Sequence, residues 1–158
     1  MRMVERPLDA TALRDWAHAS VNALIRHADE INGLNVFPVA DADTGTNMLF
    51  TMRAGLAEAD PAARTGDVGE VAAALARGAL NGARGNSGVI LSQILRALAE
   101  VTAEADRGRA DIDVAVLAAA LRHAVALVVA AMGGQVVAGT VVSVLQAAAD
   151  SVEGSADE

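Results

Sequence analysis

The sequence contains no cysteine and no lysine, and aromatic residues make up only 2% of it. Without cysteine, disulfides, zinc–thiolate sites and cysteine nucleophiles are excluded. Without lysine, a Walker A phosphate loop is excluded, because its GxxxxGK[ST] pattern requires one. All twelve basic residues are arginines, and the net charge is −8. An acidic chain without basic clusters argues against nonspecific binding of nucleic acid.

The length and apolar content predict a single domain over residues 1–158. The chain is 53% apolar, so it can form a core of Ala, Val and Leu, whose thin side chains let helices pack closely. The N-terminal sequence MRMVERPLDAT lacks the apolar centre of a signal peptide, which makes the cytoplasm the expected location.

One apolar stretch, residues 114–132, has the length of a membrane span. Arg122 and His123 lie at its centre, where each would be costly in lipid. We therefore expect a buried helix of a bundle, with His123 as a satisfied core residue, and no transmembrane segment.

Helical periodicity dominates the chain and predicts six helices. Their approximate ranges are 9–31, 46–58, 67–81, 88–105, 111–132 and 139–152. In the first, the stripe expected to face the core contains Leu13, Trp16, Ala17, Ser20, Leu24 and Ile31, and Asn32-Gly33 is expected to end the helix. No stretch shows the alternation of apolar and polar residues that is typical of a strand. The segment VFPV is short and contains Pro38, so it is expected to be an extended loop. The expected fold is an all-α antiparallel bundle without a β-sheet.

The most informative motif is LNVFPVADADTGTNM, residues 34–48. It places Asp41 and Asp43 in a tight turn directly before a helix. Oxygen ligands of this kind suit Mg²⁺, which completes its shell with water and substrate phosphate. The following helix N-terminus favours an anion. Metal and anion at one turn indicate a nucleotide.

The motif has two other interpretations. Asp and Thr are also ordinary turn and N-cap residues, so the motif could be a structural cap. An EF-hand is excluded, because Thr46 occupies the position that requires Gly and Met52 the position that requires Glu.

A second motif, GARGNSG at residues 82–88, combines three glycines with a helix start. The glycines allow close approach of the backbone to a ligand, and Asn86 or Ser87 can cap the helix. This helix N-terminus is a second candidate phosphate site. Arg84 could supply positive charge, although an arginine on a loop is usually solvated.

The number of helices between the motifs predicts where they lie. Two helices separate residues 33–45 from residues 82–88, and two more precede the junction at 133–139, where Thr140 begins another helix. In a bundle of alternating direction, junctions separated by two helices lie at the same end. All three junctions are therefore expected at one end.

The residues of these motifs make the chain similar to a known protein family. NVFPVADADTGTNM and GARGNSGVILSQIL resemble the DhaL-like nucleotide-binding domain, in particular the N-terminal domain of bacterial fatty-acid kinase. The chain is more distantly similar to the ADP-binding subunit of dihydroxyacetone kinase, also called glycerone kinase. The resemblance covers about residues 8–152. It implies a barrel of eight antiparallel helices that binds ATP and two Mg²⁺ ions at one end.

The resemblance also implies roles for single residues. Asp41 and Asp43 match the metal-binding acids, and Asn35 falls where the dihydroxyacetone kinase branch has a third acid. The implied nucleotide-binding residues are Thr44, Gly45, Thr46 and Asn47 in the first motif, Gly85, Asn86 and Ser87 in the glycine-rich loop, and Gly139 and Thr140 near the adenine pocket. No catalytic residue is assigned, because phosphoryl transfer depends mostly on positioning and charge neutralisation.

Two departures from the family pattern, PDGDTGTNM, bear on activity. Ala40 replaces the proline and Ala42 replaces the glycine. If position 42 adopts a positive φ, alanine there costs about 1 kcal/mol and displaces the metal acids. In addition, about six of the family's eight helices fall within the chain, so the resemblance implies a domain truncated at its C-terminus.

Two hypotheses for function remain open. The first is a kinase domain that uses ATP and Mg²⁺ to phosphorylate a fatty-acid carboxylate presented by a fatty-acid-binding protein. The second is a non-catalytic regulatory or interaction domain with a degenerate nucleotide site. A dihydroxyacetone kinase-type subunit is a third, weaker interpretation. The expected partners are a nucleotide and a fatty-acid-binding protein, and homodimer formation is left open.

Overall fold

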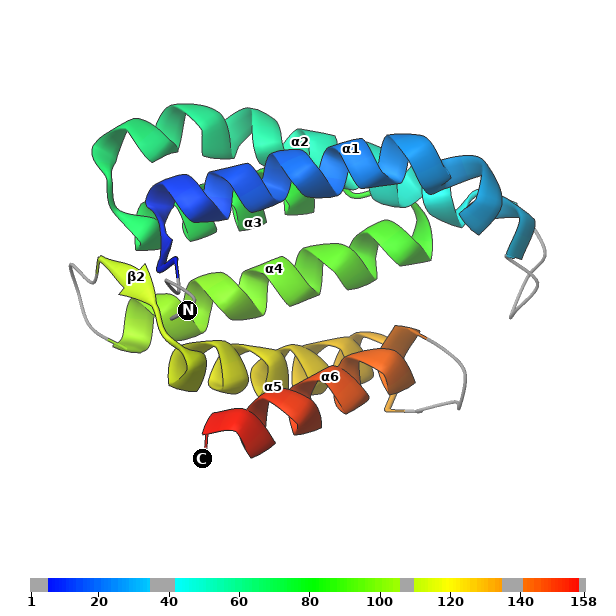
Figure 1. Ribbon diagram of the computed structural model, residues 1–158. Coiled ribbons are helices and arrows are strands. Elements are labelled where there is room, and N and C mark those ends of the chain that lie inside the picture. The colour runs from blue at the N-terminus through cyan, green and yellow to red at the C-terminus, as the bar shows by residue number, and fades with distance from the viewer. Residues whose placement is uncertain (1–5, 35–41, 106–109, 135–140, 157–158) are drawn as a thin grey trace, which may run out of the picture.

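The computed structural model describes residues 6–34, 42–105, 110–134 and 141–156. Six α-helices account for most of them (Figure 1). The elements are β1 (Leu8–Asp9), α1 (Ala10–Leu34), α2 (Thr44–Ala62), the 3₁₀ turn η1 (Ala63–Thr65), α3 (Val68–Asn81), α4 (Gly85–Ala105), β2 (Asp111–Ile112), α5 (Val114–Ala131) and α6 (Val141–Ala156). The all-α fold is confirmed.

One detail of that prediction is wrong, because a small sheet is present. β1 pairs with β2 in antiparallel fashion, with Leu8 opposite Ile112. Each strand has two residues, too few to show alternation in the sequence. The pair joins the segment before α1 to the segment before α5.

Aspartates at the helix starts explain several of the boundaries. Asp9 Oδ1 accepts a hydrogen bond from the N–H of Ala12 at 2.8 Å. Asp67 accepts from Gly69 N–H and Glu70 N–H, and Asp113 accepts from Val116 N–H at 2.8 Å. Each carboxylate satisfies N–H groups that have no partner within the first turn.

Other boundaries differ from those expected. α1 continues through Asn32-Gly33 to Leu34, because its last turn is held against α2 by contacts that the local sequence does not reveal. α2 starts at Thr44 and passes Pro61 before ending. α4 starts at Gly85, so the glycine-rich motif breaks the chain only before that residue.

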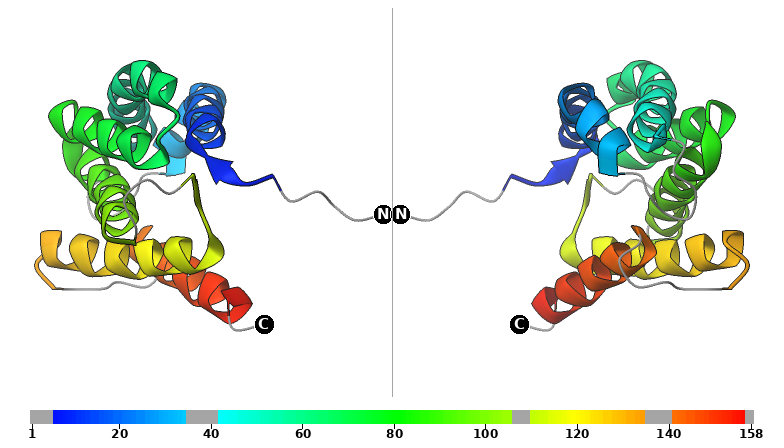
Figure 2. Two further views of the ribbon diagram at one scale, coloured as in Figure 1. Left: turned by 90° about the vertical axis from the view of Figure 1, so that its left-hand side faces the viewer. Right: turned by 90° about the vertical axis from the view of Figure 1, so that its right-hand side faces the viewer.

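The helices pack in chain order, each against the next, and form an open arc with α1 and α6 at its two edges (Figure 2). Close packing of α2 and α3 depends on Gly78, where a Cβ would lie 2.4 Å from the carbonyl oxygen of Ala54. The expectation that small residues bring helices together is met at this crossing.

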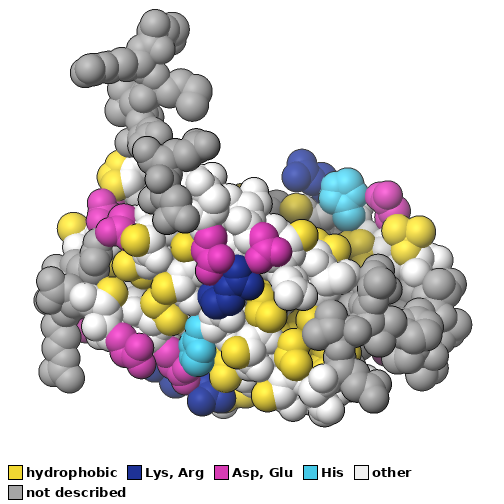
Figure 3. Space-filling view, turned by 90° about the horizontal axis from the view of Figure 1, so that it is seen from below, with side chains coloured by type: hydrophobic (Ala, Val, Ile, Leu, Met, Phe, Trp, Pro, Cys, Tyr) yellow, Lys and Arg dark blue, Asp and Glu magenta, His cyan; other side chains and the backbone are white. Residues whose placement is uncertain are grey.

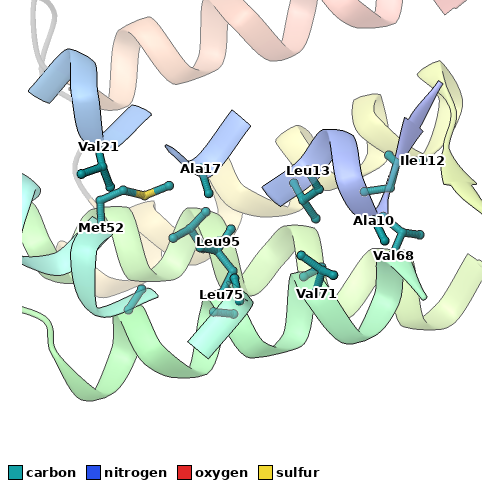
Figure 4. Packing of buried hydrophobic residues seen from close by; sticks show 14 of the residues in the cluster. Ala10, Leu13, Ala17, Val21, Met52, Val68, Val71, Leu75, Leu95 and Ile112 are labelled. Carbon is teal, nitrogen blue, oxygen red and sulfur yellow. The ribbon is translucent and has the colours of Figure 1, made fainter. Parts of the chain in front are cut away.

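Two apolar clusters form the core. The larger joins α1, α2, α3 and α4 with Ile112, and Figure 4 shows Val21 of α1 beside Met52 of α2. The smaller joins α4, α5 and α6 around Ala97, Val128 and Val142. Both lie between neighbouring helices of the arc.

The core stripe of α1 differs from the predicted one. Ala10, Leu13, Ala17 and Val21 are buried, whereas Trp16 is 46% exposed. His18 hydrogen-bonds Asp60 of α2 at 2.7 Å, and Trp16 lies about 200° away around the helix. Trp16 therefore faces away from α2, towards the open edge of the arc.

α5 packs on α4 and α6 along one face only. Among the described residues it is the one helix long and apolar enough to cross a membrane by length and composition, with a mean hydropathy of 2.2 and 28% of its residues buried. One such helix is weak evidence, because core helices also meet this criterion. The expectation of a buried helix is met only in part, and Figure 3 shows apolar side chains spread over this face of the molecule.

Candidate functional site

The first turns of α2 and α4 lie close together at the same end of the bundle, which brings the first two motifs together. A Cβ on Gly85 would lie 2.4 Å from Asn47 Nδ2. One turn further along α2, Thr51 Oγ1 accepts a hydrogen bond from Arg84 N–H at 3.2 Å. Residues 44–47 and 84–88 therefore form one surface, at the shared end of the bundle that the helix count predicted.

The third motif can be followed only to its flanks. Gly139 and Thr140 lie outside the described residues. α5 ends and α6 begins at the end of the bundle where α2 and α4 begin (Figure 1). The predicted role of Gly139 and Thr140 stays a prediction.

Glycine is needed twice at the start of α4. Gly85 has φ +63°, a conformation that residues with a side chain rarely adopt. At Gly88 a Cβ would lie 2.4 Å from Thr51 Oγ1. Thr51 is itself buried and donates its hydroxyl proton to the carbonyl of Asn47. These contacts set the spacing between the two motifs.

The start of α2 is capped from another helix. Asp43 occupies the N-cap position, with φ −125°, and its side chain makes no capping hydrogen bond. Instead, Asn32 Oδ1 accepts from Gly45 N–H at 2.8 Å and from Thr46 N–H at 3.2 Å. Asn32 Nδ2 donates to Thr46 Oγ1 at 2.9 Å. Asp43 therefore does not cap α2 with its side chain.

Sequence reasoning missed Asn32, because it was assigned only the end of the first helix. A polar residue in the last turn of one helix, followed by a second helix start, was the available signal. Its partner was not predictable, since it depends on the crossing of α1 and α2. There a Cβ on Gly45 would lie 2.4 Å from the carbonyl oxygen of Ala28.

Ala42 adopts a positive φ, the conformation that favours the glycine found at this position in the family pattern. Ala42 has φ +56° and is the one non-glycine residue with positive φ in the described part of the chain. An alanine in this region is strained by about 1 kcal/mol. The strain lies directly before Asp43.

The start of α4 offers N–H groups that α2 does not. Gly88 N–H donates to the carbonyl of Arg84, the residue before α4, so the N–H groups of Gly85, Asn86 and Ser87 precede this bond and have no partner within the helix. Asn86 is exposed and Ser87 is half-buried. The positive end of the α4 dipole is therefore available to bind an anion.

Arg84 is exposed, as expected of an arginine on a loop, but it also contacts an aromatic ring. Its guanidinium carbon lies 4.0 Å from the centroid of the Phe50 ring, a cation–π distance. The charge is thereby held beside the start of α4. No carboxylate pairs with Arg84 in the part of the chain that the structure covers.

The predicted metal site is described only at Asp43. Asn35 and Asp41 lie outside the described residues. Within the described ranges, no group of three or more His, Cys, Asp or Glu side chains could hold a metal ion. Asp43 is half-buried and takes part in no capping bond, so its carboxylate oxygens suit a hard cation.

The three histidines lie within hydrogen-bonding distance of carboxylates and are not part of the surface that the two motifs form. His18 pairs with Asp60, and His27 with Glu30. His123 is partly exposed and lies 2.7 Å from Glu100 Oε2 on α4, so its prediction as a core residue is wrong. The hydrogen bonds from His123 and Arg96 hold the pKa of Glu100 below its usual value.

A shallow hollow of about 340 Å³ runs along α1. Its described lining consists of Ala23, Leu24, His27, Glu30, Ile31 and Leu34. The described lining includes no residue of α2 or α4.

Comparison with known proteins identifies the family. The family model described as the DAK2 domain matches residues 38–158, well over half of the chain. Protein YloV of Bacillus subtilis is 47% identical over 91 residues, which are 58% of this chain and 16% of that protein. An uncharacterized protein of Staphylococcus saprophyticus is 52% identical over 73 residues, 46% of this chain and 13% of its own length.

A Staphylococcus aureus protein is 49% identical over 73 residues, again 46% of this chain and 13% of its own length. The matched segments thus cover only a small part of these curated relatives. The match to the DAK2 model includes α2, α4 and the surface that they form. The chain belongs to the DAK2 domain family, a family of nucleotide-binding, kinase-related domains.

Proposed function

We propose that the chain binds ATP together with Mg²⁺ where α2 and α4 begin, and that it transfers the γ-phosphoryl group to the carboxylate of a fatty acid. The observation that carries the proposal is the contact between Asn47 and Gly85, because it unites an acidic turn with an open helix N-terminus. The acyl group would come from a fatty-acid-binding protein, as the resemblance to fatty-acid kinase implies.

The described residues suit a polyphosphate. Gly85, Asn86 and Ser87 offer N–H groups at the positive end of α4. The positively charged guanidinium group of Arg84 lies beside them, over the ring of Phe50. Asn47 and Thr46 add polar side chains from α2. These groups bind and orient phosphate oxygens.

Asp43, with Asp41 and Asn35 as the resemblance implies, would hold Mg²⁺. Mg²⁺ neutralises charge on the phosphate oxygens when bound. A carboxylate oxygen of the fatty acid attacks the γ-phosphorus and the bond to the β-phosphate oxygen breaks, which gives an acyl phosphate and ADP. The chain contributes positioning, since this reaction requires no proton to be removed from a carboxylate.

A second candidate function is supported by Ala42. Its φ of +56° places strain directly before Asp43, and displaced acids would leave nucleotide binding without turnover. The chain would then be a regulatory domain. A dihydroxyacetone kinase-type activity has no comparable observation in its favour.

Trapping of the product tests the proposal. The chain is mixed with ATP, Mg²⁺ and palmitate carried by a bacterial fatty-acid-binding protein, and hydroxylamine converts any acyl phosphate to a hydroxamate. Hydroxamate that requires both ATP and the carrier supports the kinase. ATP binding without hydroxamate supports the regulatory candidate, and ADP formation with dihydroxyacetone in place of palmitate would overturn the fatty-acid assignment.

A further inference from the structure

The hydrogen bonds of Asn32 affect Asp43, which is not one of its hydrogen-bond partners. We infer that Asn32 is a positioning residue: it caps α2 from α1 and so leaves the Asp43 carboxylate free for the metal–nucleotide complex. The metal-binding half of this inference rests on the proposed function. The capping half rests on hydrogen bonds alone.

A helix start normally receives its cap from its own N-cap residue. Aspartate is among the preferred N-cap residues, since its carboxylate accepts bonds from the N–H groups two or three positions later. In α2 those N–H groups belong to Gly45 and Thr46, and both donate to Asn32 Oδ1. Asp43 is in the N-cap position but forms no capping bond.

The two side chains therefore compete for the same donors. Asn32 Nδ2 also donates to Thr46 Oγ1, which fixes the orientation of the amide and favours Asn32. Gly45 permits the arrangement, because it lets α2 approach the carbonyl of Ala28, one turn before Asn32. With Asn32 removed, the Asp43 carboxylate is expected to fold back onto Gly45 N–H and Thr46 N–H.

That rearrangement would withdraw a ligand from the cation. An Asp43 carboxylate engaged by two backbone N–H groups is less available to Mg²⁺. Loss of a partner that orients a metal ligand typically costs about tenfold or more in metal affinity. Asn32→Ala should therefore raise the Mg²⁺ concentration needed for ATP binding about tenfold.

A stability cycle tests the competition without any nucleotide. The melting temperature is measured for the wild type, Asn32→Ala, Asp43→Ala and the double variant. Because Asp43 takes over the cap, Asn32→Ala should lower the melting temperature less in the wild type than in the Asp43→Ala background. Equal losses in the two backgrounds would overturn the inference. If the double variant does not fold, Asn32→Gln replaces Asn32→Ala in the cycle.

The Mg²⁺ titration of ATP binding supplies the second readout. Asn22→Ala is the matched control, since Asn22 is an exposed asparagine on the same helix and should leave the Mg²⁺ midpoint unchanged. Asn32→Asp retains an acceptor for Gly45 and Thr46 and should restore the midpoint to near the wild-type value. An unchanged midpoint in Asn32→Ala, or no rescue by Asn32→Asp, would overturn the inference.

The two readouts separate this inference from the proposed function. If the wild-type chain binds no ATP at any Mg²⁺ concentration, the proposed function and the metal-binding half fail together. The stability cycle still decides whether Asn32 and Asp43 compete for the cap.

Discussion

Gly85 lies so close to Asn47 that a Cβ there would be 2.4 Å from the Asn47 amide nitrogen. The contact joins α4 to α2 close to the point where each of these helices begins. Because the nearest atom is the end of a side chain, a larger residue could be accommodated only by turning the Asn47 amide away from this surface.

Gly85→Ala separates this effect from backbone strain. The substitution should lower the free energy of unfolding by about 1 kcal/mol, because Gly85 has a positive φ, and should weaken ATP binding by displacing Asn47. Gly66→Ala is the matched control: Gly66 also has a positive φ, but its Cβ would meet nothing within 4 Å. Both losses of stability are read from urea denaturation. Equal ATP affinity in the two variants would contradict the role of the Asn47 contact.

Ala42→Gly should stabilise the acidic turn. Glycine adopts the observed φ of +56° without steric cost, so a gain of up to about 1 kcal/mol is expected, reduced by the greater freedom of glycine in the unfolded chain. ATP binding with Mg²⁺ should become tighter, because the strain before Asp43 is relieved. Calorimetric titration of both proteins measures the change, and weaker binding in the variant would refute the strain account.

Acid should loosen α6 from α5. Arg122 Nε donates to Glu153 Oε1 at 2.9 Å, and this hydrogen bond holds the pKa of Glu153 below its usual value of 4.5. Since the folded-state pKa is the lower one, the pair stabilises the chain above pH 4.5, and the contribution is lost as the pH falls through the folded-state pKa.

Glu153→Gln should therefore flatten the fall in melting temperature between about pH 5 and pH 3. Glu104→Gln, an exposed glutamate on α4, serves as the control and should follow the wild-type profile. If all three profiles coincide, Glu153 does not contribute in the way described.

The open edge of the arc should bind an apolar dye. Trp16 is 46% exposed on α1 and Val144 is 67% exposed on α6, so apolar side chains remain uncovered on both edge helices. Trp16 is the one tryptophan of the chain, and iodide should quench its fluorescence efficiently. A monodisperse monomer that binds no dye and resists quenching would contradict this prediction.

The fold was largely predictable because helical periodicity and Asp caps are local signals. The placement of the first two motifs at the same end of the bundle was predictable as well, since it depends only on the number of helices between them. Asn32 was not predictable, because its partners lie on another helix and are reached only through the crossing at Gly45. The exposure of Trp16 also escaped prediction, since periodicity shows an apolar stripe but not which side of it is covered.

ATP is proposed to bind through a cation held by Asp43, and calorimetric titration of ATP with and without Mg²⁺ is the measurement that decides whether it does. Binding should require Mg²⁺, and Asp43→Ala should weaken it more than Arg84→Ala does. The carboxylate is expected to act through the metal on several phosphate oxygens, whereas Arg84 contributes a single charge whose side chain, although it lies over the Phe50 ring, stays exposed to solvent. Equal ATP affinity in Mg²⁺ and in excess EDTA would contradict the account.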